Sequence, residues 1–181
     1  MTDTSARRLL ILRHAKSSWD SPALKDFDRP LNTRGRKAAP LMGNLIAARG
    51  WVPDLALVST ARRTRETYER LSEGWSTPPE LRCCEAIYEA SLPTLLALLR
   101  RKAGTARCVL LVGHNPGMQE LALTLSGPRP VDSLGALAAH FPTAALAALN
   151  FSIADFADLQ PATGTLEAFI KPRELSAGPD E

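Results

Sequence analysis

Cysteine is scarce in this chain, and the few cysteines exclude two common kinds of site. The 181 residues include Cys83, Cys84 and Cys108, which have neither the spacing of a zinc site nor the even number of a disulfide framework. His, Asp and Glu residues form no cluster with metal-ligand spacing either, so we expect no metal ion and no other cofactor. We expect free, buried thiols and a reducing compartment.

Long apolar runs and aromatic residues are also rare. The first apolar run, Leu9–Leu12, is shorter than the core of a secretory signal, and no run approaches the roughly 18 residues of a membrane span. We therefore expect a cytoplasmic protein with no membrane partner. The net charge is +3, but aromatic residues make up only 6% of the chain and do not alternate with Lys/Arg blocks. This pattern disfavours nucleic acid and favours a small anionic group as the partner.

Short apolar runs alternate with segments of helical periodicity. This alternation is typical of βαβ units, so we expect a three-layer αβα fold with a mostly parallel sheet. The last two strands follow each other without a helix and predict an antiparallel edge. Strands are predicted at 9–12, 55–58, 81–84, 108–112, 144–151 and 165–170, and helices at 33–49, 62–71, 92–102 and 116–127. Residues 128–142 fit neither pattern. We expect one domain over residues 1–181, with a core at about 8–171 and a loose tail at 172–181.

Reactive side chains follow three of the predicted strands, at 13–14, 59–63 and 113–115. Because the carboxyl ends of parallel strands share one edge of a sheet, we expect these groups to converge. One arginine side chain can donate two parallel hydrogen bonds to two phosphate oxygens. Two arginines and two histidines at one edge therefore predict a site for a phosphate dianion. Neither G-x-x-x-x-G-K-[ST] nor G-x-G-x-x-G occurs, which argues against a nucleotide-binding loop. Without a metal ion, phosphoryl transfer needs surrounding positive charge and an in-line nucleophile, which a neutral imidazole can supply.

Four segments resemble motifs of the histidine phosphatase (phosphoglycerate-mutase-like) superfamily. RHAKSSWD at 13–20 resembles its Arg-His-Gly-x-Ser/Thr-x-Trp-Asn signature, and LNTRG at 31–35 resembles its Leu-Thr-x-x-Gly helix entry. STARRTRET at 59–67 resembles its Ser-x-x-x-Arg-Ala-x-x-Thr element, and GHN at 113–115 resembles its second histidine element. The four matches occur in the family's order. The short chain is most similar to SixA-type phosphohistidine phosphatases, and the resemblance implies a phosphoglycerate-mutase-like fold.

The resemblance implies specific roles for the residues in these motifs. His14 would be the nucleophile that becomes phosphorylated, while Arg13, Arg63 and His114 would bind the phosphoryl oxygens and stabilise the transition state. Asn115 is a further candidate for binding substrate. Ser17 is another, although a role as a turn or helix cap is equally open.

The general acid is less well defined by the motifs. Glu85 is the candidate, because the segment at 85–89 resembles the one that supplies the acid in mutase-like members; Glu89, or no acid at all, are the alternatives. The chain also departs from the family signature twice. Ala15 replaces a glycine where the backbone approaches phosphate, and Asp20 replaces an asparagine.

Three functions remain open at this stage. The first is hydrolysis of phosphohistidine on a partner protein, or of a small phosphorylated metabolite, through a phosphohistidine intermediate. The second is a small-molecule phosphomonoesterase or mutase, which expels an alkoxide and depends more strongly on a general acid. The third is a catalytically silent phosphate-binding module. The sequence does not predict the oligomeric state.

Overall fold

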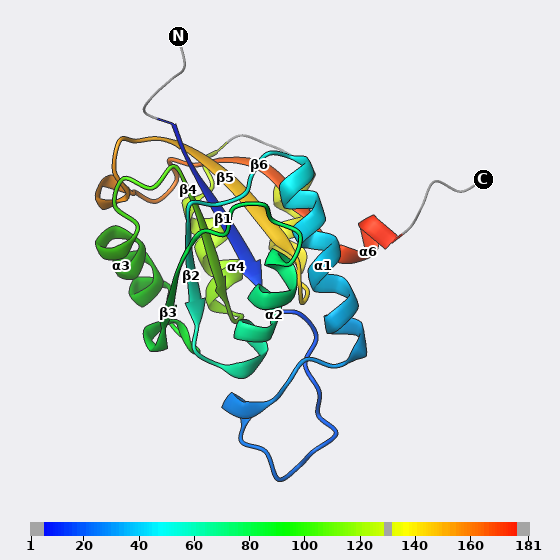
Figure 1. Cartoon of the computed structure of the whole chain (residues 1–181). Helices are drawn as coiled ribbons and strands as arrows, with labels where there is room; N and C mark the ends of the chain where they lie inside the picture. Colours follow the sequence, from blue (N-terminus) through cyan, green and yellow to red (C-terminus); the bar gives the residue numbers. More distant parts are fainter. Residues whose placement is uncertain (1–5, 129–131, 177–181) are drawn as a thin grey trace, which may run out of the picture.

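A computed structural model describes residues 6–128 and 132–176, which contain a six-stranded mixed sheet between two layers of helices (Figure 1). The strands are β1 (Ala6–Arg13), β2 (Leu55–Ser59), β3 (Glu80–Cys84), β4 (Cys108–Gly113), β5 (Leu146–Ser152) and β6 (Thr165–Ile170). The helices are α1 (Thr33–Ala48), α2 (Arg62–Ser72), α3 (Leu92–Lys102), α4 (Gly117–Leu125), α5 (Asp132–Ala139) and α6 (Pro172–Ser176). Single 3-10 turns are η1 (Asp26–Asp28), η2 (Glu85–Ile87) and η3 (Phe156–Asp158).

The strand order explains how distant segments meet at one edge. The order is β3-β2-β4-β1-β5-β6, and β3, β2, β4 and β1 are mutually parallel. The carboxyl ends of β1, β2 and β4 therefore lie side by side. Strands β5 and β6 run antiparallel to their neighbours and complete the other edge. These pairings confirm the predicted α/β fold, its mostly parallel sheet and its antiparallel edge.

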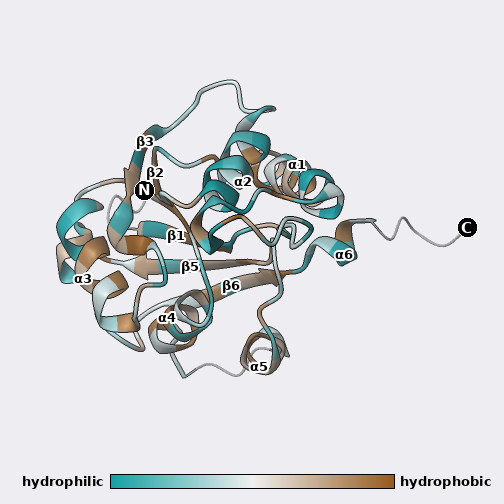
Figure 2. Ribbon diagram, turned by 90° about the horizontal axis from the view of Figure 1, so that it is seen from below, coloured by the Kyte–Doolittle hydropathy of each residue, from teal (hydrophilic) through white to brown (hydrophobic). Residues whose placement is uncertain are grey.

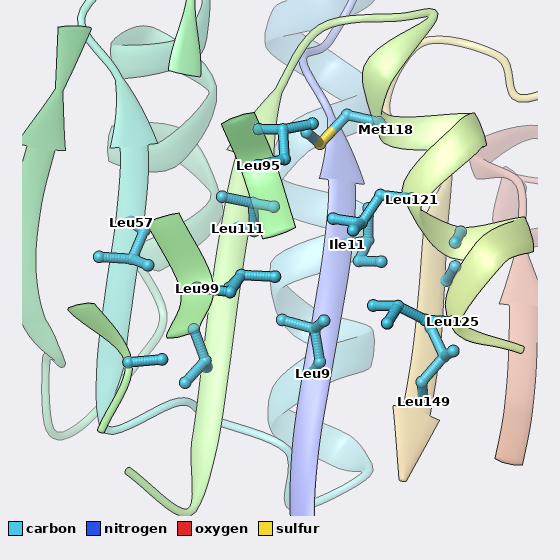
Figure 3. Close-up of a cluster of buried hydrophobic side chains, with 14 of the residues drawn as sticks. Leu9, Ile11, Leu57, Leu95, Leu99, Leu111, Met118, Leu121, Leu125 and Leu149 are labelled. Carbon is cyan, nitrogen blue, oxygen red and sulfur yellow. The ribbon is translucent and has the colours of Figure 1, made fainter. Parts of the chain in front are cut away.

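The central strand β1 is buried on both faces, as the continuous apolar run predicts. Leu9 and Ile11 point into the core beneath α3, α4 and α5, while Leu10 and Leu12 point into the core beneath α1 and α2. All four side chains are fully buried. Figure 2 shows the two helical layers on opposite sides of the sheet, and Figure 3 shows the first of the two cores. Because packing immobilises β1 from both sides, the residue that follows it has a rigid support.

Some local expectations were wrong or incomplete. Cys84 is buried as expected, but Cys83 is exposed on the edge strand β3. Residues 172–176, expected to be part of a loose tail, form helix α6, and 177–181 lie outside the described residues. Residues 132–139, which fitted no pattern, form α5. Within the described ranges, every helix is too short or too polar to cross a bilayer.

Gly35 allows the start of α1 to approach the chain segment that follows β1. The Asn32 side chain caps α1 by accepting a hydrogen bond from the Gly35 N–H (2.9 Å), and the Asn32 N–H donates to the Lys16 carbonyl (2.9 Å). A Cβ atom on Gly35 would overlap that same carbonyl oxygen. The contact therefore couples α1 to the backbone two residues beyond His14.

We expect Gly35→Ala to destabilise the protein, because the new methyl group must push α1 away from Lys16. The expected loss is about 1–3 kcal/mol in the free energy of unfolding, which urea denaturation measures. Gly135→Ala is the matched control, since a Cβ atom there on α5 would meet nothing within 4 Å. The control should be neutral or stabilising by up to about 1 kcal/mol. Equal effects of the two substitutions would contradict the close-contact explanation.

Candidate active site

Two histidines meet at the carboxyl edge of the sheet. His14 follows β1 and His114 follows β4, and the register places Arg13 of β1 opposite Gly113 of β4. The two ring centroids are 5.3 Å apart, and the planes are inclined by 52°. His14 is 7% exposed and His114 is 4% exposed. The expected convergence of the two strand ends is therefore present in the structure.

The tautomer of His14 follows from its hydrogen bond. Its Nδ1 lies 2.8 Å from the carbonyl oxygen of Ala15, which can only accept, so Nδ1 carries the proton. The lone pair is then on Nε2, which makes this nitrogen the nucleophilic atom of the ring. The Ala15 N–H donates to Thr67 Oγ1 (3.0 Å), which fixes the backbone of this turn from α2. The Ala15 methyl group is fully buried in the core beneath α1 and α2, so the departure from glycine is accommodated by packing.

The tautomer of His114 can be derived in the same way. Arg63 Nη2 lies 3.3 Å from His114 Nδ1, and a guanidinium can only donate, so Nδ1 accepts. The proton of the neutral ring is therefore on Nε2, which lies 2.8 Å from Ser59 Oγ and donates to it. Ser59 is fully buried at the end of β2. The sequence placed Ser59 inside a motif but assigned it no role, and the structure shows that it orients His114.

Both imidazoles are neutral at neutral pH. Burial lowers the pKa of His14 to about 3; the charges of His114, Arg63 and Arg13 act in the same direction, and the hydrogen bond to Ala15 opposes them. Burial, followed by the Arg63 charge, also lowers the pKa of His114 to about 3. The Nε2 lone pair of His14 is therefore available over a wide pH range.

Two arginines place positive charge beside the histidine pair. Arg63, in the first turn of α2, is 4% exposed, and Arg13 donates to the Phe141 carbonyl (2.9 Å). Burial and the neighbouring Arg63 charge lower the pKa of the Arg13 guanidinium. In the part of the chain that the structure describes, the buried Nε–H of each arginine has no hydrogen-bond partner. The arrangement of two nearby cations would be stabilised by a bound dianion.

Asp26 is a member of this site that the sequence did not single out. Its carboxylate accepts hydrogen bonds from Tyr88 Oη (2.7 Å), Arg63 Nη2 (3.0 Å) and Arg29 Nε (3.0 Å). Partial burial acts to raise the pKa of Asp26, but the Tyr88 hydrogen bond and the Arg63 charge outweigh it and lower the pKa to about 2. The Tyr88 ring also stands edge-on to His114, with centroids 5.3 Å apart. The Asp26 carboxylate is thus an anion of the protein itself that forms an ion pair with Arg63.

The two further candidates for binding substrate are engaged within the protein. Ser17 is 5% exposed, and its hydroxyl accepts a hydrogen bond from Arg29 Nη1 (2.9 Å). Asn115 donates to the Phe141 carbonyl (3.1 Å) and accepts from the Gln119 N–H (3.3 Å) in the first turn of α4. These contacts give both residues a structural role, and they place Asn115 on the same carbonyl as Arg13.

The acidic candidates from the sequence lie outside this network. Glu85 and Glu89 are exposed at and just after η2, and neither side chain makes a hydrogen bond to the site among the described residues. Asp20 is exposed as well and makes no ion pair within the described ranges. The carboxylate that contacts the site is therefore Asp26.

We expect Asp26→Asn to tighten binding of inorganic phosphate by roughly tenfold at low ionic strength. The substitution keeps the shape of the side chain but removes the negative charge that competes for Arg63. Asp28→Asn, in the same turn, is the matched control because it removes the same charge from an exposed side chain. Isothermal titration calorimetry measures both affinities. Equal changes in the two variants, or weaker binding by Asp26→Asn alone, would contradict direct competition.

Comparison with known proteins identifies related sequences. A family model of the histidine phosphatase superfamily (branch 1) matches residues 9–92. An uncharacterised protein of Mycobacterium tuberculosis is 33% identical over 164 residues, which cover 90% of this chain and 100% of that protein. An uncharacterised chloroplastic protein of Arabidopsis thaliana is 32% identical over 140 residues, and the match spans 67% of this chain but only 60% of that longer protein.

Solved structures with the same fold include two that were provisionally assigned as the phosphohistidine phosphatase SixA. The one from Agrobacterium tumefaciens is 33% identical, with a TM-score of 0.75, and the alignment covers 92% of this chain and 98% of that chain. The one from Nakamurella multipartitia is 27% identical, with a TM-score of 0.80, and the alignment covers 92% and 96% of the two chains.

Proposed function

This chain belongs to the histidine phosphatase superfamily, and we propose that it is a metal-independent phosphatase that hydrolyses phosphohistidine through a phosphorylated His14. The observation that supports this most directly is the state of the His14 ring. Its Nδ1–H is held by the Ala15 carbonyl (2.8 Å), and burial keeps the ring unprotonated. A neutral imidazole with a fixed orientation and a free Nε2 lone pair is a competent nucleophile.

In the first step, His14 Nε2 attacks the phosphorus atom of the substrate. The Nε2–P bond forms, and the P–N bond of the substrate breaks. Arg13 and Arg63 balance the negative charge of the three equatorial oxygens, and His114 lies on the same side, 5.3 Å from the nucleophilic ring. Arg63 exchanges the Asp26 carboxylate for phosphoryl oxygens as the substrate enters.

In the second step, water attacks the phosphorus atom of phosphorylated His14. The O–P bond forms, the P–Nε2 bond breaks, and phosphate leaves. Over both steps, one hydrogen of water ends on the released imidazole and the other stays on phosphate, so the protons balance. The fixed positive charges of Arg13 and Arg63 serve both transition states, because each passes through the same trigonal phosphoryl group.

The choice of phosphohistidine over an alkyl phosphate rests on the leaving group. An alkoxide must be protonated as it leaves, which requires a proton donor at the site, and a carboxylic acid can serve as that donor near neutral pH only if its pKa is raised. The carboxyl group that contacts this site is Asp26, and its lowered pKa of about 2 makes it a poor proton donor. Glu85 is exposed, and its side chain makes no hydrogen bond to the site among the described residues. Imidazole leaves more readily than an alkoxide, so a phosphohistidine substrate places less demand on an acid.

Trapping of the phosphoenzyme tests this proposal. The protein is mixed with ³²P-labelled phosphohistidine, quenched in alkali within milliseconds to seconds, and digested for peptide mapping. We expect label that is stable to alkali and labile to acid, on the peptide that contains His14. Label on an Asp26 peptide, label on His114 instead, or turnover without any labelled protein would each exclude the mechanism. A faster reaction with an alkyl phosphate than with phosphohistidine would favour the phosphomonoesterase.

A further inference from the structure

A groove lined by basic side chains lies beside the histidine pair, at the same edge of the sheet. Its volume is about 450 Å³, and no Asp or Glu lines it. Its lining residues come mainly from the first half of α1, from helix α6 and from the turn before β5. Figure 1 shows α6 beside α1. The basic groove is defined by six side chains: Lys16, Arg34, Lys37, His140, Lys171 and Arg173.

Among the residues that the structure describes, the cations of the basic groove form no ion pair with an acidic side chain. Glu174 on α6 does not line the groove, and its carboxylate accepts a hydrogen bond from the Lys171 N–H (3.1 Å). Five cations on one concave surface create a positive potential that attracts an anionic partner.

The basic groove and the candidate active site share a wall. The backbone of Phe141 contacts the active site, where its carbonyl accepts hydrogen bonds from Arg13 (2.9 Å) and Asn115 (3.1 Å). The next two residues, Pro142 and Thr143, line the groove. The Ala144 N–H returns to bond the His14 carbonyl (3.0 Å). A ligand bound at His14 therefore needs to extend only past this wall to reach the basic groove.

We propose that the basic groove binds an acidic segment of the protein that carries the phosphohistidine, and that it selects protein substrates over free phosphohistidine. This inference rests on the proposed function. A single phosphoryl dianion is already matched by Arg13 and Arg63, so five more cations exceed what a small phosphorylated metabolite requires. The groove also contains apolar surface, including Leu41, which is 36% exposed. Apolar surface interspersed with arginine is typical of protein interfaces.

Two synthetic peptides of equal length test the proposal. Each contains one phosphohistidine, introduced with phosphoramidate, flanked by glutamates in one peptide and by glutamines in the other. We expect the wild-type protein to hydrolyse the acidic peptide with about tenfold higher kcat/KM at low salt, through a lower KM, and to lose this preference in 0.5 M NaCl. Free phosphohistidine provides the reference rate for each protein.

Charge-reversal variants test whether the preference for the acidic peptide arises from the basic groove. The variant R34E/K37E/R173E is expected to remove the preference while retaining the wild-type rate on free phosphohistidine. The variant R101E/K102E/R107E is the matched control, because it makes the same charge change at exposed positions away from the groove. Equal rates on the two peptides, or an equal loss in both variants, would overturn the groove proposal and leave the phosphatase intact. Absence of turnover on both peptides and on free phosphohistidine would instead overturn the proposed function.

Discussion

Replacing His14 by Asn is expected to abolish phosphatase turnover while the protein still folds and binds phosphate. Asn places an amide N–H where His14 Nδ1–H now donates to the Ala15 carbonyl (2.8 Å), but it has no atom in the position of Nε2. Loss of the nucleophile removes the covalent route, so kcat on phosphohistidine should fall by a factor on the order of 10⁴ or more. Steady-state release of phosphate, measured after subtraction of the uncatalysed rate, gives this value.

Two further measurements separate loss of chemistry from loss of structure. The urea midpoint of His14→Asn should stay close to that of the wild-type protein, because the replacement keeps the hydrogen bond to Ala15. Binding of inorganic phosphate should also persist, because the cations Arg13 and Arg63 are unchanged. A variant that folds, binds phosphate and still turns over at a rate near that of the wild type would show that His14 is not the nucleophile.

The convergence of His14 and His114 at one edge of the sheet was predictable from the strand pattern, and the structure adds that their strands are direct neighbours. An apolar run that is buried on both sides signals a central parallel strand, and all such strands end at one edge. β1 and β4 are neighbours, so the residues that follow them must lie close together. Arg63 was predictable from its motif and the short helix start after β2. These positions depend on the apolar pattern of each strand and on the parallel arrangement of the strands, and both can be inferred from a single sequence.

Asp26, Tyr88 and Ser59 could not be assigned roles for a different physical reason. Asp26 belongs to a loop whose conformation is set by contacts with α2 and with the turn after β3, and these contacts span 37 and 62 residues in sequence. No local spacing distinguishes Asp26 from Asp28, which lies in the same 3-10 turn and is exposed. The general acid could not be predicted for the same reason. The resemblance at 85–89 identifies Glu85 by its position in the sequence, but it does not show that the Glu85 side chain lies outside the hydrogen-bonded network.

The Asp26 carboxylate explains how the positive charges of Arg13 and Arg63 are tolerated at a buried site. Arg63 donates to the Asp26 carbonyl (2.7 Å) as well as to its carboxylate (3.0 Å), so Asp26 alone gives the buried cation two acceptors. Tyr88 and Arg29 hold the same carboxylate from other directions. In the proposed mechanism, substrate binding exchanges one anion for another at Arg63. This exchange limits the affinity for phosphate, the product, and should favour its release.

The pH dependence of kcat/KM should lack the acid limb that an ordinary histidine nucleophile produces. A nucleophile with the usual pKa of 6.5 is only about 3% neutral at pH 5, which would reduce the rate roughly thirtyfold. Burial lowers the pKa of His14 to about 3, so the ring stays neutral and the rate should remain near its plateau at pH 5. An acid-stable aryl phosphate, assayed alongside phosphohistidine, separates this effect from acid hydrolysis of the substrate. A limb centred near pH 6.5 with both substrates would contradict the depressed pKa.

We expect acid unfolding of the protein, and not protonation of His14 in the folded state, to set the lowest pH at which the protein is active. The unfolded chain binds protons at His14 and His114 below about pH 6.5, whereas the folded protein does so only near pH 3. Folding stability therefore falls as the pH drops through this window, by about 1.4 kcal/mol per pH unit for each histidine. Asp26 acts in the same direction at lower pH, because its stabilising contribution is lost as the pH falls from about 4 through its pKa of about 2. For a total stability of about 7 kcal/mol, near the lower end of the typical range, the two contributions together bring the wild-type protein to its unfolding midpoint at roughly pH 4, before His14 is protonated in the folded state. His14→Asn removes one of the two contributions, so its acid-unfolding midpoint, followed by circular dichroism, should shift to lower pH; an unchanged or higher midpoint would show that His14 is not held neutral by the fold.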